Sequence, residues 1–128
     1  LCEGTLTAPR YAAARHILVS RRGLEQGPID EALAHLGLAR EAATLVPGFA
    51  TALALVRGSD LVATVPERHC AALHADLVTL PLPFPLAGIR VALIWHPSQD
   101  ADPAHRWLRT LIRETCAQAP YGGDTRDS

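Results

Sequence analysis

The sequence has no lysine, no methionine and only three cysteines among its 128 residues. All twelve basic residues are therefore arginines, and the net charge of the chain is −1. This balance gives no argument for binding nucleic acid or an anionic membrane. Cys2, Cys70 and Cys116 are odd in number and far apart, which favours free thiols in a reducing compartment.

Long apolar runs are also missing. No stretch approaches the roughly 18–20 residues that a membrane-spanning helix needs. The amino terminus lacks the basic region and apolar block of a signal peptide. We therefore expect a cytoplasmic protein without membrane attachment. The absence of an initiator methionine indicates a piece of a longer protein.

The residues that are present are typical of a globular domain, with 48% apolar and 20% charged side chains. Short apolar runs alternate with helical patterns, which predicts an α/β fold with parallel strands and right-handed crossovers. The expected strands cover residues 16–20, 42–46, 61–65, 77–82 and 89–95. The expected helical segments are a short turn around 9–15, a helix that opens at Pro28, and helices over 49–57, 66–73 and 103–117.

The last of these helices has the most complete sequence signal. Asp102 is a strong N-cap, because its carboxylate can accept hydrogen bonds from the amides of the first turn. Pro103 follows at the first helical position, where its missing N–H costs nothing. Trp107, Leu108 and Leu111 then recur at helical spacing, which predicts one apolar stripe that docks on a core.

Residues 95–109, which run from Trp-His through Asp-Pro-x-His-x-Trp-Leu, resemble the carboxy-terminal end of the effector-binding domain in LysR-type transcriptional regulators. Further blocks are similar to the same domain, in the family's order and with roughly its spacing, over about residues 5–117. These blocks are residues 16–20, 27–30, 36–40, 46–49 and 59–66.

The resemblance implies a type II periplasmic-binding-protein-like fold, of which this chain holds mostly one subdomain. Residues 1–80 would form the second lobe, partial at its start, and residues 81–88 would be a crossover segment. Residues 89–117 would supply the returning strand and last helix of the first lobe. Residues 118–128 are Gly-rich and polar, and we expect a disordered tail there. DNA binding would belong to a helix-turn-helix domain outside this chain.

The candidate ligand-binding residues are Gly48, Phe49, Ala50, Thr64 and His16. Open α/β sheets bind ligands beyond the carboxyl ends of their strands, where helix amino termini offer partial positive charge. Gly48–Ala50 begin a helix after one strand, and the resemblance implies effector contacts at this junction. Structural roles stay open for each residue: a turn for Gly48, core packing for Phe49, strand propensity for Thr64 and, as the better interpretation, a buried structural histidine for His16.

The function that the resemblance implies is sensing of a small effector, of which an aromatic or apolar-bodied ligand is the favoured kind, with self-association through the effector domains. We expect no enzyme and no cofactor, because the sequence has no nucleophile elbow, phosphate loop or dinucleotide motif. We also expect no metal site, because His69 and His74 would lie on different faces of a helix and no fourth ligand follows at zinc-finger spacing. Two alternatives stay open. The chain is a dimerisation fragment that senses nothing, or a stand-alone solute-binding protein of the same fold.

Overall fold

The computed structural model describes residues 4–88 and 92–118. They fall into two compact units, Leu1–Gly88 (unit 1) and Ile89–Ser128 (unit 2), and we describe each by itself. Whether these units correspond to the two lobes that the resemblance implies stays a prediction. None of the helices in the described ranges has the length and apolar character that a membrane-spanning helix needs.

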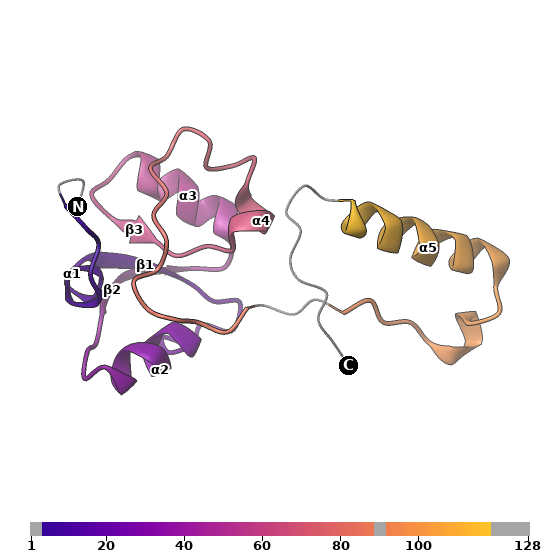
Figure 1. The fold of residues 1–128 in the computed structure, drawn as a ribbon, viewed down its shortest axis with the longest axis horizontal. Coiled ribbons are helices and arrows are strands. Elements are labelled where there is room, and N and C mark those ends of the chain that lie inside the picture. Colours follow the sequence, from indigo (N-terminus) through magenta and orange to yellow (C-terminus); the bar gives the residue numbers. More distant parts are fainter. Residues whose placement is uncertain (1–3, 89–91, 119–128) are drawn as a thin grey trace. The chain divides into compact units, whose positions relative to one another are not determined.

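Unit 1 is built around a three-stranded parallel sheet in the order β2-β1-β3 (Figure 1). In register, Val19 of β1 pairs with Val46 of β2, and His16 pairs with Val62 of β3. The predicted α/β class with parallel strands is therefore confirmed. The elements are α1 (Ala8–Ala12), β1 (Arg15–Val19), α2 (Pro28–His35), β2 (Glu41–Val46), α3 (Phe49–Arg57), β3 (Val62–Ala63) and α4 (Glu67–Cys70).

Local sequence explains where α2 begins and ends. Pro28 occupies the first turn, and the Gly27 amide donates to the Asp30 carboxylate at 2.9 Å. The helix ends before Gly37, whose φ of +69° lies in the left-handed region that side chains with a Cβ rarely adopt. The start of α2 therefore places Asp30 at a fixed position facing the rest of unit 1.

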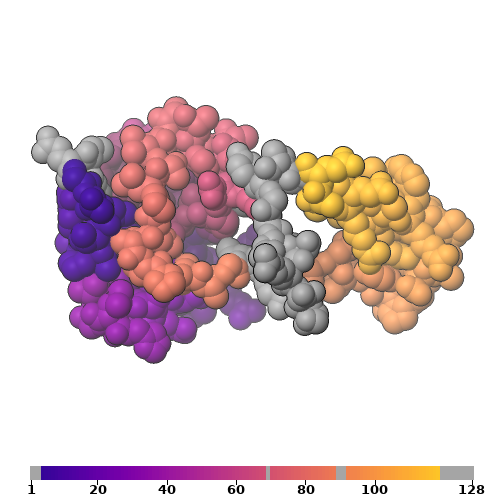
Figure 2. Space-filling view, in the orientation of Figure 1, coloured from indigo at the N-terminus to yellow at the C-terminus, as the bar shows by residue number. Residues whose placement is uncertain are grey.

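Two apolar clusters hold unit 1 together, and α2 and α3 lie on opposite sides of the strands in Figure 1. The first cluster centres on Tyr11, Ala12 and Leu33, and the second on Ile17, Val46 and Ala52. The segment after α4 runs across the surface of unit 1 (Figure 2) and inserts Phe84 into the first cluster. Phe84, with Leu82 packed against the same cluster, thus ties that irregular segment to the core.

Four predictions for unit 1 need correction. The helix expected over 66–73 ends at Cys70, and the Leu73 carbonyl accepts a hydrogen bond from Arg57 instead of continuing a helix. The segment 77–82 forms no strand, because prolines remove backbone donors and Val78 remains 79% exposed. The strand expected over 61–65 shortens to β3. Helix α3 is also less buried than expected: its Leu55 is 41% exposed.

Unit 2 consists of a short 3₁₀ turn, η1 (Pro97–Gln99), and helix α5 (Pro103–Ala117). The predicted bounds of this helix are confirmed at both ends, and the Asp102 carboxylate accepts from the His105 amide at 2.7 Å. Residues 92–95 form no strand, since a strand needs a hydrogen-bonding neighbour and the described residues supply none. The rest of that predicted strand, 89–91, and the predicted tail over 119–128 lie outside the described residues.

Candidate functional site

Tyr11, at the end of α1, is the centre of a polar network that sequence reasoning did not single out. Its side chain is 6% exposed, and its hydroxyl lies 2.7 Å from the Thr64 hydroxyl. Its backbone carbonyl lies 2.8 Å from Nε2 of His16, and the two rings stand 4.6 Å apart. Two of the predicted ligand residues, His16 and Thr64, are therefore joined through one tyrosine.

His16 is completely buried at the start of β1. Because a carbonyl can only accept, Nε2 carries the proton and donates it to Tyr11, which leaves Nδ1 as a bare acceptor. This Nδ1 has no hydrogen-bond partner among the described residues. Burial lowers the pKa of His16, although the backbone hydrogen bond to Tyr11 works in the opposite direction. The imidazole is therefore neutral at neutral pH.

Arg40 and Asp30 form the charged end of the network. The guanidinium binds both carboxylate oxygens of Asp30, at 2.8 and 2.9 Å, and lies 3.4 Å from the Tyr11 hydroxyl. Burial works against the charge on Asp30, but the hydrogen bonds from Arg40 and the Gly27 amide outweigh it, so the pKa of Asp30 lies below its ordinary value. Burial likewise opposes the charge on Arg40, and its bond to Asp30 still raises its pKa.

Thr64 follows β3 directly and is half-buried. Its neighbour Ala63 packs against the second apolar cluster, whereas the Thr64 hydroxyl meets Tyr11 of the first cluster. This alternation is what an extended backbone produces, since successive side chains point to opposite faces. Thr64 is thus a polar group at the carboxyl end of a strand, which is where the sequence placed it.

Gly48, Phe49 and Ala50 form the junction between β2 and α3. Gly48 caps the helix in an extended conformation and supplies no side-chain acceptor to its first turn. Ala50 is exposed and Phe49 is half-buried. Because β1 lies between β2 and β3, Gly48 and Thr64 lie on opposite sides of β1. Thr64 follows Ala63, which pairs with Ile17, whereas Gly48 lies two residues beyond Val46, which pairs with Val19.

The structure therefore brings His16 and Thr64 together and leaves the helix start separate. No hydrogen bond between the described residues joins Gly48 or Ala50 to Thr64 or His16. All five residues belong to unit 1. That they contact one ligand stays a prediction.

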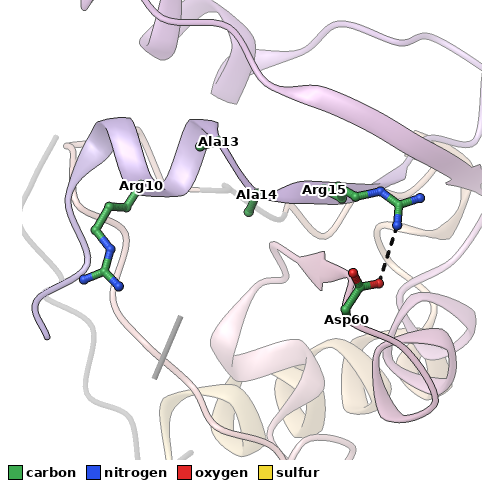
Figure 3. A pocket seen from close by; sticks show the side chains of 5 residues that line it. All are labelled: Arg10, Ala13, Ala14, Arg15 and Asp60. Atoms are coloured by element: carbon green, nitrogen blue, oxygen red, sulfur yellow. Dashed lines mark ion pairs between the residues drawn. The ribbon is translucent and has the colours of Figure 1, made fainter. Parts of the chain in front are cut away.

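Two surface hollows are lined by other residues. One, of about 400 Å³, lies at the opposite edge of the sheet, where Arg15 begins β1 and pairs with Asp60 at 3.6 Å (Figure 3). The other, of about 390 Å³, belongs to unit 2 and is lined by Trp95, Asp100, Arg106, Arg109, Thr110 and Arg113. In residues 4–88 and 92–118, no three His, Cys, Asp or Glu side chains are placed to share a metal ion.

Arg109 organises the second hollow. Although it lies on α5, it is 6% exposed, because it stacks on the Trp95 ring at 4.5 Å from the ring centre. It donates to the backbone carbonyls of Gln99 and Asp100 at 3.1 and 2.9 Å. This arginine therefore fastens η1 to α5, and its structural role was not predicted.

Comparison with known proteins identifies the family that the chain matches. The LysR substrate binding domain family matches residues 1–117. The chain is 36% identical over 116 residues to the HTH-type transcriptional regulator SyrM of Rhizobium meliloti (strain 1021), covering 88% of this chain and 36% of that protein. It is 29% identical over 119 residues to the HTH-type transcriptional activator NagR of Ralstonia sp, covering 91% and 40%.

A solved structure agrees with these relatives. The regulatory domain of MexT, a transcriptional activator in Pseudomonas aeruginosa, matches with a TM-score of 0.77 and 36% identity, over 89% of this chain and 58% of that chain. The predicted periplasmic-binding-protein-like α/β architecture is confirmed by this likeness together with the parallel sheet. The chain spans 36% and 40% of the two regulators that it matches in sequence.

Proposed function

This chain belongs to the LysR substrate-binding domain family, and on that premise we propose that it is the effector-sensing domain of a DNA-binding transcriptional regulator. The observation that carries the proposal is the family match over residues 1–117. The relatives named SyrM and NagR support it, because both are HTH-type regulators of transcription.

The effector site of this proposal lies at the carboxyl edge of the sheet in unit 1. At that edge it comprises Gly48, Phe49 and Ala50 at the start of α3 and Thr64 after β3. The fifth candidate, His16, lies at the start of β1 and is connected to Thr64 through Tyr11. Ligands of open α/β sheets bind at this edge, because strand ends and helix amino termini leave backbone groups there without partners. The three residues at the start of α3 carry no charged side chain, which favours a ligand with an apolar or aromatic body.

The sensing mechanism is a shift between two arrangements of the regulator. In a cleft between two lobes, an effector stabilises the arrangement in which it contacts both, so the population of that arrangement rises with effector concentration. The regulator would act in the cytoplasm and bind DNA through a separate helix-turn-helix domain. Its effector domains would associate with one another, which light scattering over a concentration series would detect.

A ligand screen on the intact regulator tests this function. We would measure its melting temperature against small aromatic acids and neutral aromatic metabolites, since a ligand that binds the native state alone raises that temperature. Thr64→Val serves as a site variant, and Asp60→Asn, in the hollow at the opposite sheet edge, serves as the matched control. We expect at least one compound to stabilise the wild type and the control more than the Thr64 variant. Stabilisation by no compound would overturn the proposal.

A further inference from the structure

We propose that the Thr64 hydroxyl is a dedicated hydrogen-bond donor to the effector, and that Asp30, Arg40 and Tyr11 form a relay that fixes this polarity. The effector must then present an acceptor oxygen, from a carboxylate or a carbonyl group, at this point. The inference rests on the proposed function, because it names the chemistry of the ligand at the same sheet edge.

The relay begins at a group that can only donate. A guanidinium has five N–H donors and no acceptor, so the 3.4 Å contact of Arg40 with the Tyr11 hydroxyl makes the tyrosine oxygen the acceptor. Asp30 fixes the guanidinium in place with two further bonds, and the Arg40 side chain is 8% exposed. In the first hydrogen bond of the relay, Arg40 is therefore always the donor and the Tyr11 oxygen always the acceptor.

The second step follows from the proton on Tyr11. The phenolic proton needs an acceptor, and the Thr64 oxygen lies 2.7 Å away. If Thr64 donated instead, the Tyr11 oxygen would accept twice and its own buried proton would have no partner among the described residues. A buried donor without a partner is costly, so the arrangement in which Tyr11 donates to Thr64 is favoured.

The third step concerns the proton that Thr64 retains. The Thr64 hydroxyl makes no other hydrogen bond within the described part of the chain, so its proton is available at a half-buried position. The tyrosine itself is held in place, since its carbonyl accepts from His16 and its ring packs on Phe84 with centres 5.2 Å apart. Tyr11 is thus a positioning residue, and the group that meets the ligand is Thr64.

One test needs no ligand. Proton NMR of the protein would follow the hydroxyl protons of Tyr11 and Thr64 at low temperature. We expect a slowly exchanging Tyr11 hydroxyl signal with a nuclear Overhauser contact to the Thr64 methyl group, and loss of that signal in Thr64→Val. A protected Thr64 hydroxyl beside a fast-exchanging Tyr11 hydroxyl would overturn the relay. This outcome is independent of whether any effector binds.

A second test compares probes of opposite polarity by calorimetry. Benzoate offers only acceptors, and benzylammonium offers only donors. We expect Thr64→Val and Tyr11→Phe each to weaken benzoate binding about tenfold, the size of one lost hydrogen bond, and Thr64→Ser to retain it. The double variant should lose little more than Thr64→Val alone, because Tyr11 acts on the ligand only by orienting the Thr64 hydroxyl.

The outcomes separate the two proposals. Benzylammonium binding that falls in Thr64→Val while benzoate binding stays unchanged would overturn the inference and leave the sensing function intact. If the intact regulator binds neither these probes nor any compound of the ligand screen, the proposed function fails, and the hydroxyl measurement still decides the relay.

Discussion

Units 1 and 2 are stabilised by different kinds of interaction. Unit 1 buries apolar side chains on both sides of its sheet, with Leu33 and Ala52 completely covered. Within residues 92–118 the one buried side chain is a charged one, Arg109, while Trp107 remains 66% exposed. Unit 1 therefore carries its own core, whereas unit 2 is a helix and turn fastened by stacking and polar contacts.

The same comparison explains the apolar stripe of α5. The sequence predicts that this stripe docks on a core, yet Leu108 and Leu111 are 44% and 43% exposed in the structure. The chain spans only 36% and 40% of two of its relatives. We therefore propose that the stripe packs on further elements of the first lobe in the longer regulator, as the resemblance implies.

The largest difference in stability between the two units should come from a matched pair of leucine-to-alanine substitutions. Leu33→Ala removes a completely buried side chain of the first cluster and should lower the free energy of unfolding by about 3 kcal/mol. Leu111→Ala, on the exposed stripe, should cost less than about 1 kcal/mol in the chain as given. Urea denaturation followed by circular dichroism measures both values. Equal losses would show that unit 2 shares the core of unit 1.

The next largest effect on stability should come from the ion pair between Arg40 and Asp30. Arg40→Met leaves the Asp30 carboxylate with 21% of its side chain exposed and without its cation, which should cost about 2 kcal/mol. Arg57→Met, at a pair whose side chains are 39% and 62% exposed, should leave stability unchanged within error. Because the pKa of Asp30 is lowered in the fold, its contribution is present above pH 3.8 and is lost as the pH falls through the folded-state pKa. The penalty of Arg40→Met should therefore shrink in acid.

In unit 2, the corresponding substitution is at the buried arginine, Arg109. Arg109→Met removes the stacking on Trp95 and two hydrogen bonds to backbone carbonyls, and should loosen η1 from α5 by about 2 kcal/mol. In a Trp107→Phe background, Trp95 is the remaining tryptophan and its fluorescence reports this contact. We expect stronger acrylamide quenching after the arginine is removed. Unchanged quenching would mean that other contacts hold the ring.

The smallest effect should be the titration of His16. Since burial lowers its pKa, the unfolded state binds the proton more readily, and stability falls as the pH drops below the ordinary value of 6.5. We expect the loss between pH 7.5 and 5.5, measured by chemical denaturation, to be smaller in His16→Leu than in the wild type. A steeper dependence in the variant would contradict this account.

Local signals in the sequence predicted local features well. The start of α5 follows from Asp102 and Pro103, and the carboxyl-edge position of Thr64 follows from its place near the end of the run 61–65, which Pro66 stops. The segment 77–82 was predicted wrongly, because apolar composition does not reveal whether a strand has a neighbour. The relay was missed for the same reason: Tyr11 meets Arg40 and Thr64 across 29 and 53 residues of chain, and no spacing rule links such positions.

We propose that the effector binds at the carboxyl edge of the unit 1 sheet. Amide NMR of the intact regulator, titrated with a compound that stabilises it, would locate the binding site. We predict that the largest shifts fall at Gly48–Ala50 and at Thr64. Shifts confined to the hollow beside Arg15 and Asp60, or to the arginines around Trp95, with the carboxyl edge unchanged, would contradict it.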